Sequence, residues 1–144
     1  MVFGKNITVE TSGFSDIRDI TGSVGEVVHK SGIKNGIVHV FAVGSTASVT
    51  TIEYEPALVE DMKGQLEKFA SSTMQSRHSE TWGDDNGFSH IRATFMGRGM
   101  TMTDLRVMSS TKTFSNFNCL IFIVYLFHMN LCFSFIFLCS FKYF

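Results

Sequence analysis

The sequence predicts an α+β fold with a mostly antiparallel sheet and two helices. Short runs rich in Val, Ile and Thr alternate with polar neighbours, as half-buried strands do. Two other stretches place apolar residues three and four positions apart, which is typical of helices that bury one face. In chain order these segments form strand, helix, strand, strand, helix, strand and strand, all within residues 1–108. This order is typical of an α+β domain.

The domain opens on a strand and a helix. The strand is predicted over residues 5–12, where apolar and polar residues alternate. Ser15 or Asp16 can then cap a helix. Gly32 is a suitable end for it, because glycine readily adopts the left-handed conformation that follows a helix. The apolar face of this predicted helix consists of Ile17, Ile20, Val24, Val27 and Val28.

Two strands and a second helix are predicted next. The strands cover residues 36–43 and 47–54, and the turn Gly44-Ser45-Thr46 joins them. Proline is favoured in the first turn of a helix, so Pro56 marks the start of a helix that runs to about Ala70.

The rest of the domain is predicted to be loop and strand. Residues 71–89 are mostly polar and contain turn-forming glycines. Two last strands are predicted over residues 91–95 and 100–107, with a glycine-containing connection between them. No internal repeat is evident in the chain, and the elements are enough for one domain.

Residues 109–144 differ in composition from the domain before them. They hold nine of the 15 phenylalanines and all three cysteines, but no glycine, alanine, proline or acidic residue. The uncharged stretch from Phe117 to Phe141 is long enough for a membrane helix. Membrane helices have no reason to exclude alanine and glycine together, however. We therefore interpret residues 109–144 as a gene-model artefact, with a membrane anchor as the alternative.

Charge and composition exclude some classes of function. The formal net charge of −1 provides no electrostatic footprint for nucleic acid. The first ten residues lack the apolar core of a signal peptide, and the first 108 residues contain no cysteine. We therefore expect a cytoplasmic protein, which lies at a membrane only if residues 109–144 are a true anchor.

Residues 77–92 concentrate the side chains that could carry chemistry. His78 and His90 lie twelve positions apart, and the loop between them is rich in acidic residues. Two imidazoles with a carboxylate such as that of Asp84 could hold a divalent ion, Mg²⁺ or Zn²⁺, or transfer protons near neutral pH. By spacing alone, a solvated acidic loop with two unrelated histidines explains the pattern at least as well, and both interpretations stay open.

Other residues could bind phosphate or orient an imidazole. The hydroxyls and backbone N–H groups of Ser45 and Thr46 could hold an oxyanion, and Arg92 or Arg98 could pair with a phosphate. Neither segment has the spacing of an established phosphate loop, so surface ion pairing is the simpler explanation for the arginines. Glu53 lies in a β-rich run, where the solvent face of a strand would also explain it.

Two separated motifs carry a family resemblance. They are VFAVGSTASVTTIEYEP, residues 40–56, and HSETWGDDNGFSHIRATFMGRGMT, residues 78–101. In this order and spacing the chain resembles the YjbQ-like family, also described as secondary thiamine-phosphate synthase, over most of residues 5–108. The resemblance implies an α+β homotrimer with a polar pocket of histidines and carboxylates that sometimes holds a metal. It also implies that a thiazole phosphate is joined to a pyrimidine pyrophosphate.

The resemblance implies roles for individual residues. His78 and His90 match the two histidines that flank the family's acidic loop, as acid–base groups or metal ligands, with Asp84 as a further metal ligand. Glu53 matches the glutamate after the first motif and would orient an imidazole. Asn86 matches the polar residue before the second histidine and would bind the ligand. The other candidates for binding a small phosphorylated substrate are Ser45, Thr46 and Arg92.

Departures from the family pattern weaken the expectation of activity. Gly44 stands where many members have a histidine, and Ser79 where an aspartate often follows the first histidine. The family's final strand pair with its LGTWQ-like motif is missing, and residues 109–144 replace it. Unpaired backbone groups at a sheet edge would result, so we expect a poorly folded or inactive chain. The alternatives are a non-enzymatic metal- or small-ligand-binding trimer and a tail-anchored membrane protein.

Overall fold

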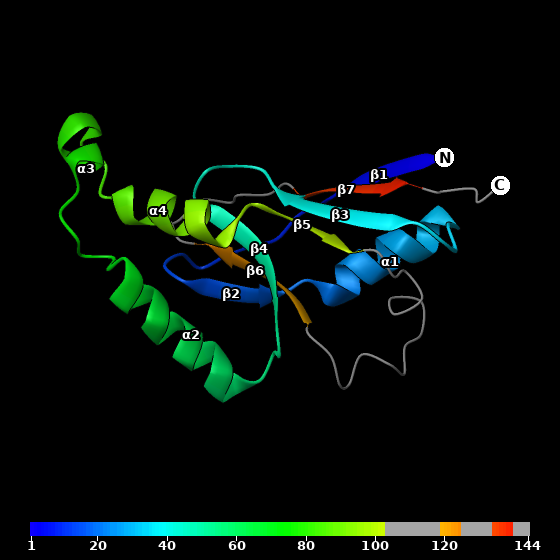
Figure 1. Ribbon diagram of the computed structural model, residues 1–144, viewed down its shortest axis with the longest axis horizontal. Coiled ribbons are helices and arrows are strands. Elements are labelled where there is room, and N and C mark those ends of the chain that lie inside the picture. The colour runs from blue at the N-terminus through cyan, green and yellow to red at the C-terminus, as the bar shows by residue number, and fades with distance from the viewer. Residues whose placement is uncertain (103–118, 125–133, 140–144) are drawn as a thin grey trace.

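The computed structural model describes residues 1–102, 119–124 and 134–139, which form two antiparallel sheets flanked by helices (Figure 1). One sheet has four strands in the order β1-β7-β3-β5, and the other has three in the order β2-β6-β4. Every strand pair in them is antiparallel, which confirms the predicted α+β class. The strands are β1 (Val2–Ile7), β2 (Asp16–Asp19), β3 (Ile37–Ala42), β4 (Ala47–Ile52), β5 (Gly99–Met102), β6 (Cys119–Val124) and β7 (Ser134–Cys139).

The described chain contains four helices instead of the two predicted. They are α1 (Thr21–Ser31), α2 (Pro56–Phe69), α3 (Arg77–Trp82) and α4 (Gly87–Met96). The second predicted helix is confirmed as α2, with Pro56 in its first turn and the Glu55 side chain accepting backbone N–H groups at its start. The predicted end of the first helix is also confirmed, because Gly32 adopts a left-handed φ of 67°.

The first helix begins later than the sequence predicts. Asp16–Asp19 form the strand β2, which pairs with β6, and α1 begins only at Thr21. The carboxylate of Asp19 accepts the N–H of Thr21 at 2.8 Å, so the break between strand and helix has its own hydrogen bond. The pairing partner of β2 lies more than one hundred residues further along the chain, and no local pattern could reveal it.

The second misassigned segment is the predicted strand over residues 91–95, which is part of α4. The buried positions of this helix include Phe88, Ser89, Arg92 and Ala93, which recur at helical spacing. Two of them are polar, so the periodicity is invisible to a count of apolar residues alone. The strands predicted over 36–43 and 47–54 are confirmed as β3 and β4.

Two strands from residues 109–144 occupy central positions in the sheets. β7 pairs with both β1 and β3, and β6 pairs with both β2 and β4. The strands expected to be missing are therefore supplied by segments rich in β-branched and aromatic residues, which favour strands. The rest of residues 103–144 lies outside the described part of the chain. Whether residues 109–144 are a gene-model artefact is a question about the gene, and this interpretation stays a prediction.

The membrane-anchor alternative required one long helix over residues 117–141. Within that stretch the described segments 119–124 and 134–139 are strands with partners on both sides. Among the described residues, no helix combines the length and apolar character needed to cross a bilayer.

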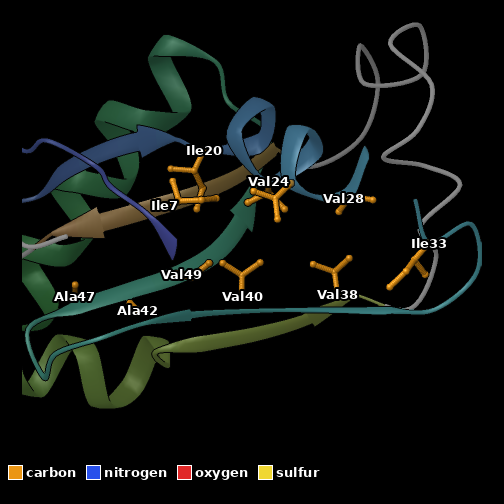
Figure 2. Packing of buried hydrophobic residues seen from close by; sticks show 11 residues of the cluster. Ile7, Ile20, Val24, Val28, Ile33, Val38, Val40, Ala42, Ala47 and Val49 are labelled. Carbon is orange, nitrogen blue, oxygen red and sulfur yellow. The ribbon is translucent and has the colours of Figure 1, made fainter. Parts of the chain in front are cut away.

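The main core lies between α1 and the four-stranded sheet. Figure 2 shows Val38 and Val40 of β3 pointing toward Val24 and Val28 of α1, and all four are buried. The alternation along β3 places every second residue on this face. A second cluster, around Phe88, joins α4 to the end of α2. One of the two helices that carry the candidate site, α4, packs on this second cluster through Phe88 and Ala93.

A proline in β7 is expected to destabilise the fold strongly. Ile136 pairs with Lys5 on one side and Val40 on the other, so Ile136→Pro removes a ladder hydrogen bond from a central strand. We expect the free energy of unfolding in urea to fall by at least about 2 kcal/mol. The control Ile136→Val keeps the ladder, and an equal unfolding midpoint for both variants would contradict the placement of β7.

Candidate functional site

Two histidines that lie twelve positions apart in the sequence meet in the structure. α3 carries His78 and α4 carries His90, and their ring centroids lie 4.7 Å apart with planes inclined by 61°. An edge-on contact is a favoured arrangement of flat rings. Figure 1 shows α3 at one end of the molecule, next to the start of α4. The sequence suggested that a folded loop could bring His78 and His90 together. In the structure two short helices do so instead.

Hydrogen bonds at the helix ends hold α3 and α4 in place. Ser76 caps α3, because its Oγ accepts the N–H of Ser79 at 3.1 Å. Gly83 ends α3 with a left-handed φ of 70°, and its N–H donates to the carbonyl of Ser79. At the start of α4 the carbonyl of Asn86 accepts the Oγ–H of Ser89 at 2.6 Å. The connection between the two helices is thus short and bonded at both ends.

A carboxylate and an amide complete the group. Oδ1 of Asp84 lies 3.5 Å from Nε2 of His78, which is an ion-pair contact when the imidazole is protonated. The other oxygen of Asp84 accepts a hydrogen bond from Nδ2 of Asn86 at 3.0 Å. We call His78, Asp84, Asn86 and His90 the histidine cluster. The structure brings these four candidates together, and their chemical roles stay predictions.

The histidine cluster contains two buried polar atoms that find no hydrogen-bond partner among the described residues, Nε2 of His78 and Oδ1 of Asn86. Such atoms are rare in native proteins and ask for a functional explanation. Imidazole nitrogens and carboxylate oxygens are suitable ligands for Zn²⁺. Within the described residues, however, no three or more His, Cys, Asp or Glu side chains are grouped so as to hold a metal ion. The roles of His78, His90 and Asp84 as metal ligands stay a prediction.

Gly87 sets the close approach of the two helices. A Cβ at this position would lie 2.1 Å from Oγ of Ser76 and 3.5 Å from Cβ of His78. The first of these distances is far below any real contact, so a side chain on Gly87 would push the start of α3 away. From the sequence, Gly87 is one of the turn-forming glycines of residues 71–89. Its packing role depends on the contact with α3 and carries no sequence signal.

Arg92, a sequence candidate for phosphate binding, is fully buried. Its Nε donates to the carbonyl of Ala70 at 2.8 Å, one Nη to Oγ of Ser15 at 2.8 Å, and the other to Oε1 of Glu67 at 2.7 Å. The guanidinium carbon also lies 4.9 Å from the ring centroid of Phe88. Arg92 thus ties α4 to the end of α2 and to the β1–β2 turn, and this structural role replaces the expected contact with phosphate.

The remaining candidates lie apart from the histidine cluster. Glu53 is exposed just after β4, and β4 leads into the first turn of α2, whereas α3 follows the far end of α2 (Figure 1). Ser45 is exposed and Thr46 is buried in the β3–β4 turn, where Arg98 donates to the carbonyl of Gly44 at 3.2 Å. Arg98 follows α4 at the end opposite the histidine cluster. The roles of these residues are untested predictions.

A cleft of about 600 Å³ shares α3 with the histidine cluster, and no sequence motif predicts it. Its walls are the β1–β2 turn, the loop after α2, and α3 with the residues that follow. We call it the α3 cleft, and its lining includes Phe14, Met74, Ser76, Ser79, Glu80 and Asp85. The only sequence signal is the run of hydroxyl side chains after α2, which looks like an ordinary polar loop.

Replacing Gly87 by alanine should disturb the histidine cluster. Gly87→Ala forces Ser76 to move, and overpacking of this kind costs about 1–3 kcal/mol of stability. The matched control is Gly64→Ala on α2, where an added Cβ meets nothing within 4 Å. Urea unfolding and the imidazole NMR signals of His78 and His90 are the measurements. Unchanged stability and unchanged signals in Gly87→Ala would contradict the packing described here.

The ion pair of Glu67 with Arg92 should make stability depend on pH. Burial raises the pKa of Glu67, but hydrogen bonds from Arg92 and Ser72 outweigh it and hold the pKa below the ordinary 4.5. Because the folded pKa is the lower one, this stabilisation is present above about pH 4.5 and is lost as the pH falls through the folded value.

Thermal melts between pH 6 and pH 3 measure this effect. This range includes the pKa of an unperturbed glutamate, which is about 4.3. Glu67→Gln should flatten the acid loss of stability relative to the wild type. Glu60→Gln removes an exposed carboxylate paired with Lys63 on the same helix and serves as the control. Parallel curves for wild type and Glu67→Gln would show that the ion pair does not contribute.

The chain is similar to known proteins. The family described as UPF0047 protein YjbQ-like matches residues 5–108. A UPF0047 protein of Methanothermobacter thermautotrophicus is 33% identical over 101 residues, which cover 70% of this chain and 69% of the relative.

Solved structures show the same fold. A YbjQ-like protein of unknown function from Sulfolobus solfataricus P2 matches with a TM-score of 0.86 and 26% identity, over 97% of this chain and 98% of that one. A hypothetical protein from Aeropyrum pernix K1 matches with a TM-score of 0.76 and 19% identity over the same shares, which shows the fold alone. Both matches extend past residue 108. On the family match and the 33% identical relative together, the chain belongs to the UPF0047 YjbQ-like family.

Proposed function

We propose that this chain joins a thiazole phosphate to a pyrimidine pyrophosphate, as its resemblance to secondary thiamine-phosphate synthase implies. The observation that supports this is the edge contact of His78 and His90 beside the carboxylate of Asp84. Neighbouring imidazoles can donate and accept protons near neutral pH. Asn86, which is hydrogen-bonded to Asp84, is the residue that would hold the ligand.

The proposed reaction is a substitution at the carbon that carries the pyrophosphate. The ring nitrogen of the thiazole provides the electron pair of the new C–N bond, and the C–O bond to pyrophosphate breaks with its pair on the oxygen. The attacking nitrogen becomes a cation, so no base is needed for the attack. A protonated His78 or His90 therefore acts on the leaving side, by donating an N–H to the departing oxygen. Asp84 orients the imidazole of His78.

The phosphate of the thiazole substrate needs a site of its own. Arg92 is held inside the molecule by three hydrogen bonds and does not enter the proposal. Arg98, with Ser45 and Thr46 in the neighbouring turn, remains the candidate. Because α4 separates this turn from the histidine cluster, the proposal includes the homotrimer implied by the resemblance. In that assembly the turn of one copy and the Glu53 of that copy would approach the cluster of another.

The second candidate function is binding of a metal or small ligand without turnover. Nε2 of His78 and Oδ1 of Asn86 favour it, because both atoms are buried, form no hydrogen bond with the described residues and could bind a ligand. A divalent ion, Mg²⁺ or Zn²⁺, would need a further ligand in addition to those that the described cluster provides. The proposed homotrimer is the natural source of that ligand.

Histidine variants of the full chain separate the two functions. We expect His78→Ala and His90→Ala each to lower kcat for thiamine phosphate formation by about 100-fold or more, the usual contribution of a general acid. His29→Ala removes an exposed histidine at the end of α1 and serves as the control. Titration with Mg²⁺ and Zn²⁺ after chelation, and the molar mass from light scattering, accompany the assay.

Each outcome selects one function. Turnover by the wild type and by His29→Ala, with a loss in both cluster variants, supports the transferase. Metal binding that depends on His78 and His90, without any turnover in the wild type, supports the binding function. Unchanged turnover in both cluster variants contradicts the proposed role of the histidines.

A further inference from the structure

The α3 cleft has an aromatic wall that is held in an unusual conformation. Phe14 and Ser15, in the β1–β2 turn, have φ values of 20° and 55°, and positive φ is rare for a bulky residue. Such backbone persists only where the surroundings enforce it, and it occurs preferentially at ligand sites. Here Oγ of Ser15 accepts a hydrogen bond from the buried Arg92 at 2.8 Å.

The ring of Phe14 is fixed by the same interactions. It stacks on the buried ring of Phe88, with centroids 5.9 Å apart and planes inclined by 29°, and Arg92 lies over the same Phe88 ring at 4.9 Å. Phe14 nevertheless remains 46% exposed and lines the α3 cleft. A large apolar ring that is positioned from behind and open to a cleft is suited to stack on a flat ligand.

The lining of the cleft also carries negative charge. Among its lining residues the charged ones are Glu80 and Asp85, and no described residue forms an ion pair with either carboxylate. The hydroxyls of Ser76 and Ser79 are part of the same lining, and each can accept a further hydrogen bond. The side chain of Met74, a polarisable thioether suited to contact with flat rings, also lines the cleft.

We propose that the α3 cleft binds a planar organic cation, which stacks on Phe14 and donates N–H groups to Glu80 and Asp85. An aromatic face and two carboxylates both favour positive charge, and they disfavour a phosphate or a carboxylate at the same place. The site uses none of the residues of the histidine cluster. The inference therefore stands or falls separately from the proposed transferase function.

Benzamidine and benzamide test the proposal, because they share a flat ring and a similar shape but only benzamidine is a cation at neutral pH. In isothermal titration of the full chain at low ionic strength, we expect benzamidine to bind about tenfold more tightly than benzamide, the factor typical of one charge-assisted contact. Added sodium chloride should reduce this preference, since salt screens partly exposed charges.

Variants locate the binding. The double variant Glu80→Gln with Asp85→Asn should bring the two affinities to within about twofold of each other, since it removes the charge and keeps the shape. Asp61→Asn removes an exposed carboxylate of α2 that does not line the cleft, and it should preserve the preference. Phe14→Ala should weaken both probes about tenfold by loss of the stacking surface, whereas Phe14→Tyr keeps a ring and should retain binding.

The control for the aromatic variants is Phe95→Ala, which removes a 74% exposed ring outside the cleft lining. Thermal melts of every variant identify any loss of folding, and Phe14→Tyr keeps the test valid if Phe14→Ala unfolds. The proposal is overturned if benzamidine does not bind, if both probes bind the wild type equally, or if the preference survives in the Glu80 and Asp85 double variant. Binding that is unaffected by His78→Ala agrees with a site separate from the histidine cluster.

Discussion

The buried guanidinium of Arg92 is the interaction on which the functional end of the molecule depends. A charge without access to water is very costly unless hydrogen bonds and an opposite charge replace the lost hydration. Arg92 finds these partners in two segments that are distant from it in the sequence, Ser15 in the β1–β2 turn and Glu67 with Ala70 at the end of α2. The requirement to satisfy one guanidinium thus fixes α4 against the end of α2 and against the β1–β2 turn.

Both candidate sites inherit their geometry from this arrangement. α4 carries His90 toward His78 on α3, and the β1–β2 turn presents Phe14 to the α3 cleft. α3 contributes to both sites, with His78 in the histidine cluster and Ser79 and Glu80 in the lining of the α3 cleft. Because Arg92 contacts both Phe88 and Glu67, changes at either residue would alter the support that both sites share.

The scaffold and the site differ in how local they are. The histidine cluster is built within residues 78–90, from two short helices joined by a capped connection. The sheets, in contrast, depend on β6 and β7, whose partners lie near the other end of the chain. Contacts of such large sequence separation form late and slowly in folding. The histidine cluster thus joins residues that are close in the sequence, whereas the sheets join residues from opposite ends of the chain.

Sequence alone predicted the α+β class, the extent of α2, and the strands β3 and β4. Each of these follows from periodicity, capping residues or short spacing, which are local properties of the chain. The tertiary structure alone decided that residues 16–19 are a strand, that residues 91–95 belong to a helix, and that Arg92 points inward. It also decided the central positions of β6 and β7 and the existence of the α3 cleft. The reason is the same in each case, since these features are set by partners far away in the sequence, which no local pattern encodes.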